Sequence, residues 1–141
     1  MNRASALGEV LESVVSWSRR LGATAGAPFR GVQLTRSQRE ALFLIAHRPT
    51  PMSPGLLAHE LRLTPGAVTQ LLDGLRQAGL VEQQPHPSDA RSRILALTPD
   101  AGRQVADFEQ AMVTALAGEF SDLDDAELAT LANLLSRTVQ H

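Results

Sequence analysis

Two arginines stand where the sequence predicts the tip of a β-hairpin. The stretch "EQQPHPSDARSRILALT", residues 82–98, begins polar, turns at two prolines, presents Arg91 and Arg93, and ends in an apolar, strand-like run. A hairpin tip packs against little of its own chain, so guanidinium groups there are suited to a negatively charged partner. We expect Asp89 to pair with Arg91 or with backbone N–H groups of the loop, which would hold the tip rigid. The alternative is a solvated hairpin with a weak surface ion pair.

A helix with a slim polar face precedes this hairpin. In "LTPGAVTQLLDGLRQAGL", Thr64 is the expected N-cap, Pro65 opens a helix over 65–78, and Gly79 ends it. The apolar positions Val68, Leu71, Leu72 and Leu75 repeat at helical spacing and face the core. The opposite face presents Gly66, Thr69, Gln70, Asp73 and Gly74, with Arg76 near its far end.

Such a face is suited to the major groove of B-DNA, which admits a helix carrying hydrogen-bonding groups. Gln70 can pair with adenine, and Thr69 can touch a thymine methyl group or a phosphate. The free N–H groups of the first turn can bind a phosphate, and Pro65 and Gly66 allow a close approach. An ordinary solvated helix face is the alternative for these side chains considered alone.

The elements that must position these groups follow from capping residues and periodicity. We expect helices over about 4–22, from Thr35 with Gln38 in a capping box, from Ser53 with Pro54 at the first position, and over 65–78. Strands follow at 80–84 and 93–97, and "PMS", residues 51–53, is positioned to add a one-bridge strand. A helix capped by Thr98 runs to about Gly118, and the last helix is capped near Ser121 or Asp122.

This order predicts a mainly α fold with a small β-wing: a winged helix-turn-helix flanked by N- and C-terminal dimerisation helices. We expect one domain over 1–141, with a winged-helix DNA-binding lobe at 30–100 and a helical dimerisation region at 1–29 and 101–141. The dimer residues are the apolar positions Leu7, Val10, Leu11, Val14, Leu128, Leu131 and Leu135. These give more apolar stripe than one small winged helix covers; the alternative is an intramolecular helical cap.

The charge distribution favours a polyanion at the middle of the chain. The formal net charge is -2, yet residues 30–103 hold nine arginines against six acidic residues, whereas residues 104–141 hold one arginine against seven acids. All 13 basic residues are arginine. Either the base composition of the genome or a need to recognise phosphate and guanine would explain this bias.

Several classes of function are disfavoured by what the sequence lacks. There is no cysteine, which excludes disulfides, thiolate metal sites and thiol catalysis. The four histidines are scattered, and neither a phosphate-binding loop nor a nucleophile elbow occurs, so we expect no enzyme, metal or cofactor. Glu9 and Glu12 interrupt the apolar pattern of the N-terminus, so we expect neither a signal peptide nor a membrane span, and a cytoplasmic location.

The whole pattern resembles the MarR (multiple antibiotic resistance regulator) family of bacterial transcription factors. The resemblance covers nearly the whole chain and is most specific in "LTPGAVTQLLDGLRQAGLVEQQPHPSDARSRILALTPDAG". Asp89 and Arg91 match the family's Asp-x-Arg wing, and Thr64, Pro65, Gly66, Thr69 and Gln70 match the DNA-facing start of its recognition helix. Gly74 departs from the family, because many members carry an arginine there that is expected to meet phosphate; Arg76 lies on a different face.

The resemblance implies an obligate homodimer that binds a palindromic operator in double-stranded DNA. It also implies repression of nearby genes and release by a small phenolic or lipophilic effector. We expect a pocket for that effector near Trp17, Phe29, Phe43 and Phe108, although each of these also fits a simple place in the core. The alternative function is a winged-helix module for protein contacts without specific DNA binding; binding that ignores salt, or no DNA binding, would favour it.

Overall fold

The computed structural model describes residues 1–24, 29 and 32–139. The chain divides into two compact units. Gly26–Glu109 forms the first, here called the winged-helix unit, and Met1–Ala25 with Gln110–His141 forms the second, the terminal-helix unit. Each unit is described by itself, and helix α5, Pro99–Leu116, begins in the first and ends in the second.

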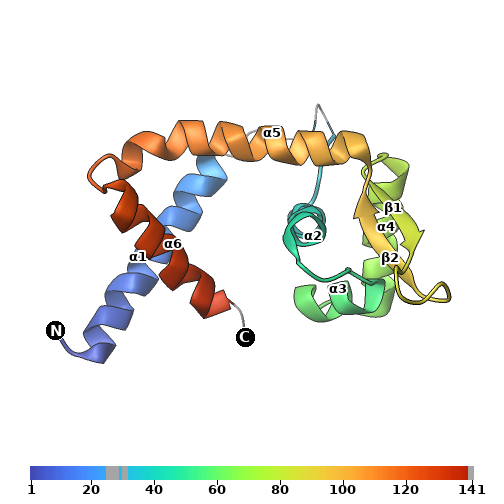
Figure 1. Ribbon diagram of the computed structural model, residues 1–141, viewed down its shortest axis with the longest axis horizontal. Helices are drawn as coiled ribbons and strands as arrows, with labels where there is room; N and C mark the ends of the chain where they lie inside the picture. The colour runs from blue at the N-terminus through green and yellow to red at the C-terminus, as the bar shows by residue number, and fades with distance from the viewer. Residues whose placement is uncertain (25–28, 30–31, 140–141) are drawn as a thin grey trace. The chain divides into compact units, whose positions relative to one another are not determined.

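The winged-helix unit contains three helices, a two-stranded antiparallel sheet and the first part of α5 (Figure 1). The helices are α2 (Arg36–His47), α3 (Pro54–Leu61) and α4 (Pro65–Gln77). The strands β1 (Val81–Pro85) and β2 (Arg93–Leu97) pair from Val81 opposite Leu97 to Pro85 opposite Arg93. Met52 adds a single antiparallel bridge to Leu95, as the sequence predicts. The predicted mainly α, winged helix-turn-helix fold is therefore confirmed.

Local capping explains where these helices begin. The hydroxyl of Thr35 accepts the N–H of Gln38, whose side chain in turn accepts the N–H of Thr35, which completes the predicted capping box. The hydroxyls of Ser53 and Thr64 likewise accept the N–H groups of Leu56 and Ala67 and cap α3 and α4, each followed by proline at the first helical position. Gly79 follows α4 with φ of 72°, a left-handed conformation that glycine adopts without strain.

The core of this unit lies between the three helices, the sheet and the start of α5. The predicted inner face of α4 is buried, and it packs with buried side chains from every neighbouring element. The largest fully buried side chains are Phe29, Leu42, Leu57, Val68, Leu72 and Leu75. This core fixes α4 against α2 and α3, so the opposite face of α4 is held in a defined position at the surface.

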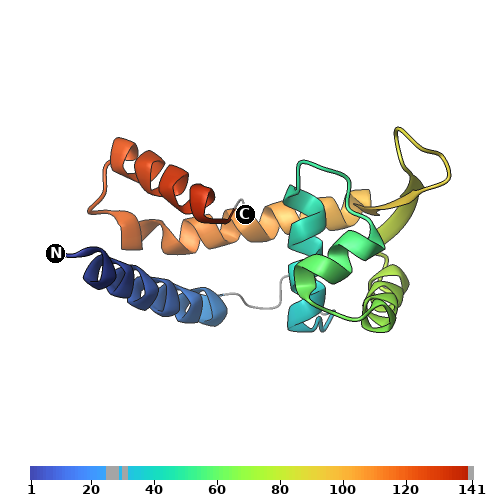
Figure 2. The same ribbon diagram turned by 90° about the horizontal axis from the view of Figure 1, so that it is seen from below.

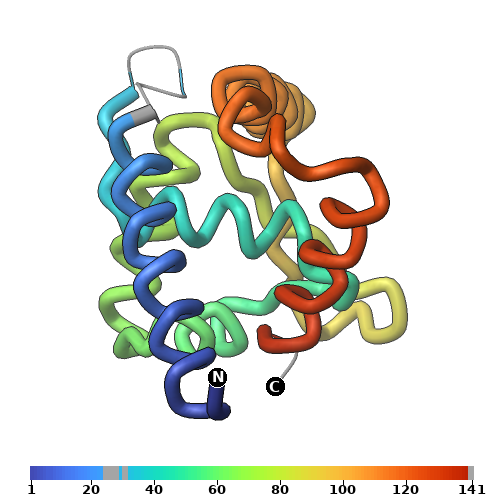
Figure 3. Tube along the Cα trace, turned by 90° about the vertical axis from the view of Figure 1, so that its left-hand side faces the viewer, coloured from blue at the N-terminus to red at the C-terminus, as the bar shows by residue number. Residues whose placement is uncertain are grey.

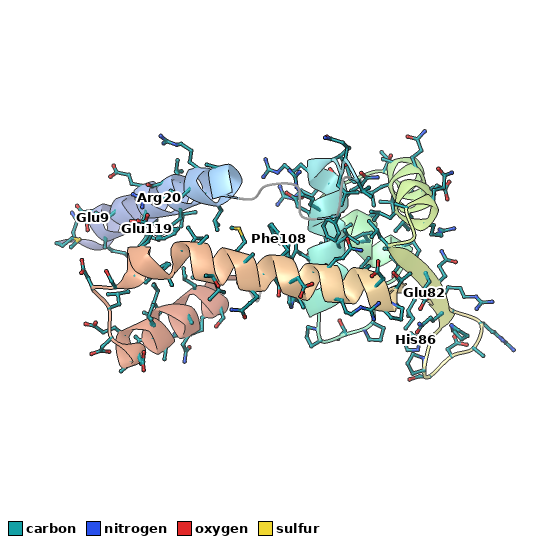
Figure 4. The ribbon with its side chains drawn as sticks, turned by 90° about the horizontal axis from the view of Figure 1, so that it is seen from above. Glu9, Arg20, Glu82, His86, Phe108 and Glu119 are labelled. Carbon is teal, nitrogen blue, oxygen red and sulfur yellow. The ribbon has the colours of Figure 1, made fainter. Side chains whose placement is uncertain are left out.

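The terminal-helix unit consists of α1 (Arg3–Thr24), the last part of α5, a short 3-10 helix η1 (Ala117–Phe120) and α6 (Asp125–Val139). Figure 3 shows α1 in blue and α6 in red lying apart from each other. Where α1 meets η1, Trp17 stacks on Phe120 with ring centroids 4.6 Å apart, and Arg20 forms an ion pair with Glu119 (Figure 4). No residue of this unit whose exposure is described is buried.

The start of α6 differs from the prediction. The sequence places its cap near Ser121 or Asp122, but the structure has a turn at these positions, directly after η1. Asp124 is the cap instead: its carboxylate accepts the N–H of Glu127, and the Glu127 carboxylate accepts the N–H of Asp124. This second capping box satisfies two N–H groups, which explains why it prevails over the earlier candidates.

None of the helices within residues 1–24 and 32–139 is both long enough and apolar enough to cross a membrane.

Candidate nucleic-acid interface

The outer face of α4 is exposed and polar, as the sequence predicts. We define this outer face as Thr64, Pro65, Gly66, Thr69, Gln70 and Asp73, all of which are solvent-exposed. Within the described residues, the Gln70 amide has no hydrogen-bond partner, so both its donor and its acceptor are open to a ligand. The Thr69 hydroxyl donates to the Pro65 carbonyl at 3.0 Å, which leaves its oxygen lone pair and methyl group free.

The first turn of α4 leaves one N–H group directed outwards. Pro65 has no N–H, and the Ala67 N–H donates to the Thr64 hydroxyl at 3.2 Å. The Gly66 N–H finds no acceptor among the described residues, and the absence of a Cβ on Gly66 leaves open space beside it. A helix start with a free N–H and a favourable dipole is suited to an anion.

The charge at the far end of α4 is partly balanced. Arg76 lies 3.7 Å from Asp73 on the preceding turn, and both side chains are exposed. Such a surface pair contributes little to stability, so Arg76 can exchange its carboxylate partner for a phosphate at small cost. Its contact with DNA stays a prediction.

Gly74 does not lie on an open part of this surface, in contrast to the expectation. A Cβ placed on Gly74 would come within 2.8 Å of Nε2 of Gln38, at the start of α2. The glycine therefore lets the α2 start lie directly over α4. The capping motif identified Gln38 and helical periodicity identified Gly74, but neither signal shows that the two residues meet, because the contact joins two helices.

The wing loop, residues 86–92, is held by hydrogen bonds between its own residues. Asp89 accepts the Arg91 N–H at 3.0 Å through one carboxylate oxygen and the Ser92 hydroxyl at 3.3 Å through the other. Of the two roles expected for Asp89, the structure therefore shows the backbone contact. His86 also contributes, because its Nδ1 accepts the Ser88 N–H at 3.0 Å, a role that sequence reasoning missed.

The wing cations are free at the surface. Arg91 and Arg93 are both exposed, and neither forms an ion pair with any residue that the structure describes. Figure 2 shows the wing loop projecting beyond the helices of its unit, and Figure 4 labels Glu82 and His86 on the wing. The loop thus holds Arg91, and the start of β2 holds Arg93, and neither guanidinium group has a partner among the described residues.

An apolar surface lies on the terminal-helix unit, at the predicted dimer residues. On α1 the side chains of Leu7, Val10, Leu11 and Val14 are 50–56% exposed. On α6 Leu131 and Leu135 are exposed and Leu128 is half-buried. Val15, Leu134 and Val139 extend this surface beyond the residues that the sequence identified. Helical periodicity could have found them, since Val15 and Leu134 adjoin predicted positions and Val139 lies one helical turn after Leu135.

The aromatic residues expected near an effector are divided between the two units. Phe29 is fully buried in the winged-helix core, and Phe43 contacts Phe108 with ring centroids 5.9 Å apart. Trp17 belongs to the terminal-helix unit and packs on Phe120. The winged-helix unit also has an open pocket of about 420 Å³, whose lining includes Ile45, His47, Leu97, Val105 and Glu109. Whether any of these residues binds an effector stays a prediction.

A helix-turn-helix followed by a two-stranded wing, with the second helix exposed along a polar face, defines the winged helix-turn-helix class of proteins. Comparison with known proteins narrows this class. The model of the MarR family matches residues 32–92. The HTH-type transcriptional regulator YdgG of Bacillus subtilis is 27% identical over 105 residues, which cover 73% of this chain and 68% of YdgG. Four further curated relatives are matched over 54–63% of their own length.

Solved structures extend the similarity to nearly the whole chain. Wild-type MarR of E. coli in its apo form is 28% identical, with a TM-score of 0.61, over 94% of this chain and 96% of that one. MepR of S. aureus bound to ethidium bromide is 18% identical, with a TM-score of 0.64, over 99% of this chain and 95% of that one, and it supports the fold alone. In sequence over residues 32–92 and in fold over nearly its whole length, the chain is thus similar to transcriptional regulators of the MarR family.

Proposed function

We propose that this chain is a homodimeric, sequence-specific DNA-binding regulator that represses transcription and is released by a small ligand. The observation that carries the proposal is a pair of exposed surfaces in one unit: the polar outer face of α4 and the wing cations Arg91 and Arg93. The first matches the hydrogen-bonding edges of the major groove, and the second matches the negative potential of an adjacent minor groove.

Each group of the proposed interface has a distinct role. Gln70 reads a base, because an amide can donate to and accept from adenine at once. Thr64, Pro65, Gly66 and Thr69 bring the helix start against the backbone, where the Gly66 N–H binds a phosphate. Arg76, Arg91 and Arg93 supply cationic contacts, and Asp89 keeps the wing loop in shape so that Arg91 loses less rotamer entropy on binding.

The homodimer is supported by the apolar surface of α1 and α6. Isolated helices with half-exposed leucine and valine stripes are poorly stable in water, so this surface requires a partner. A second copy of the chain presents the same stripe, which a two-fold axis can bring together. A symmetric dimer would bind two half-sites whose centres lie about 34 Å apart, one turn of DNA.

The effector is proposed to be a small phenolic or lipophilic molecule. The contact of Phe43 with Phe108 and the open pocket beside α2 and α5 offer apolar surface in the winged-helix unit. A ligand releases DNA only if it binds more tightly to a conformation that fits DNA poorly than to one that fits it well. The bound ethidium of MepR is a property of that protein, and it suggests a class of compounds to test here.

The test of the function is a titration of fluorescently labelled random-sequence duplexes with the full-length protein, followed by anisotropy at two salt concentrations. We expect binding that weakens steeply with salt, because phosphate contacts release counterions. Binding that ignores salt, or no binding, would favour the alternative of a protein-interaction module. Gln70→Ala is the matched variant for base reading: it should relax base preference more than it weakens non-specific binding.

A further inference from the structure

Gln38, at the start of α2, has an amide group that is held from one side and open on the other. Its Oε1 accepts the Thr35 N–H at 2.9 Å, as half of the capping box. Because the oxygen is engaged by a donor, the orientation of the amide is fixed, and Nε2 must point away from the cap. Within residues 32–139 this Nε2 has no hydrogen-bond acceptor.

The open side of this amide lies over α4. Nε2 of Gln38 is the nearest atom to the point where a side chain on Gly74 would begin, at 2.8 Å. Gly74 lies four residues after Gln70, so the two positions share one stripe of the helix. The Gln38 amide nitrogen therefore extends the outer face of α4 by one turn, although it belongs to another helix.

The surroundings of Gln38 favour an anionic partner. The first turn of α2 holds no acidic residue, and a helix start carries a partial positive charge. Arg39, the next residue, is exposed; its guanidinium donates to the Leu34 carbonyl at 3.3 Å and meets no carboxylate that the structure describes. The residue type is informative too, since glutamate completes a capping box as well as glutamine does. Only glutamine leaves an N–H donor on the outer side.

We propose that Gln38 binds a backbone phosphate of the DNA through its Nε2, as a contact that α2 adds to those of α4 and the wing. The inference rests on the proposed DNA-binding function. A phosphate is the expected acceptor because Gly74 lies in the second half of α4, beyond the Gly66 and Gln70 end that enters the groove. The capping box already orders the Gln38 side chain in the free protein, so little further conformational entropy is lost when it binds. Gly74 leaves the space that the amide occupies.

The test is Gln38→Glu, measured against Gln110→Glu. Glutamate keeps the capping box, so the melting temperature should be unchanged or higher, while a carboxylate now faces the phosphate. We expect affinity for an operator duplex to fall by about tenfold to a hundredfold, the range of a hydrogen bond to a charged group. Gln110, on α5, makes the same change of net charge; its side chain has no hydrogen bond within the described residues, and its variant should bind like the wild type.

Two further measurements separate the possible outcomes. Gly74→Ala leaves Gln38 in the sequence but displaces its amide, and it too should weaken binding while raising the helix propensity of α4. A third experiment replaces the backbone phosphates of the duplex one at a time by neutral methylphosphonates. At one position the replacement should lower the affinity of the wild type but not that of Gln38→Glu. A long-range charge effect would not depend on a single phosphate in this way. Equal affinity of Gln38→Glu and wild type would overturn the inference alone. A wild type that binds no DNA would overturn the proposed function and this contact together.

Discussion

The winged-helix unit and the terminal-helix unit differ in where their apolar side chains lie. In the first, residues such as Leu42 and Leu72 are fully buried among helices and sheet. In the second, residues such as Leu11 and Leu135 are about half exposed, and no described side chain is buried. The first unit therefore contains the core that holds its own surface groups in place. The second contains an apolar surface whose burial must come from elsewhere, and we attribute it to the second copy of the chain.

The largest effect should come from a charge in that apolar surface. Leu11→Glu would bury an unpaired carboxylate in the dimer, at a cost of about 3–5 kcal/mol per site. We expect light scattering to give the mass of two chains for the wild type and of one chain for the variant at micromolar concentration. Leu11→Met is the matched control, because it keeps an apolar side chain of similar volume and should remain a dimer. A wild-type protein with the mass of one chain would remove the proposed role of this surface.

The next largest effect is expected from a substitution in the core of the winged-helix unit. Leu72→Ala removes a fully buried side chain of the winged-helix core, which should lower the free energy of unfolding by about 2–5 kcal/mol. Because this core needs no partner, the loss should be the same at low and high protein concentration in denaturant unfolding. For Leu11→Glu, by contrast, the difference from the wild type should grow with concentration. The same concentration dependence for both variants would mean that the two units do not differ in this way.

A smaller effect is expected at the wing. Arg91→Ala should weaken DNA binding by about 1–3 kcal/mol and reduce its salt dependence, since a cationic contact is lost. The protein fold should be unaffected, because Arg91 is exposed and unpaired among the described residues. Arg103→Ala is the control: Arg103 is exposed in the same unit, but it lies outside the wing and is paired with Asp100. Equal DNA affinity for the Arg91 variant and the wild type would exclude the wing from the interface.

The smallest effect is also the least intuitive. Asp89→Ala removes a negative charge from the wing, and simple electrostatics would predict tighter binding of DNA. We expect binding that is weaker by about 1 kcal/mol, because the Arg91 N–H and the Ser92 hydroxyl lose their acceptor and the loop becomes less ordered. Anisotropy would measure the affinity, and amide exchange of the wing loop would report its order. Tighter binding with unchanged exchange would contradict this role for Asp89.

Much of the fold follows from local signals in the sequence. The caps at Thr35, Ser53 and Thr64 were predictable because each side chain binds N–H groups only three residues away. The bridge of Met52 and the buried face of α4 followed from their position and periodicity. The strand β1 was misplaced by one residue, since "LVEQQ" and "VEQQP" fit the same alternation and only the pairing with β2 decides between them.

Other features depend on contacts that the sequence does not display. The predicted start of α6 was wrong because several possible capping residues follow one another there. The Glu127 carboxylate accepts the N–H of Asp124, and this contact makes Asp124 the cap. The approach of Gln38 to Gly74 and the stacking of Trp17 on Phe120 join distant segments and leave no periodic signal. The candidate interface was thus predictable in its exposed residues, and less so in the groups that extend or support it.

Selection of bound sequences from random duplex DNA by the full-length protein, repeated at two salt concentrations, tests the central claim most directly. The account predicts enrichment of a palindrome whose two half-sites are centred about 10 base pairs apart, with lower recovery at the higher salt. Recovery of no sequence above background, or of sequences without two-fold symmetry at equal yield in both salts, would contradict a symmetric dimer that reads DNA through α4 and the wing.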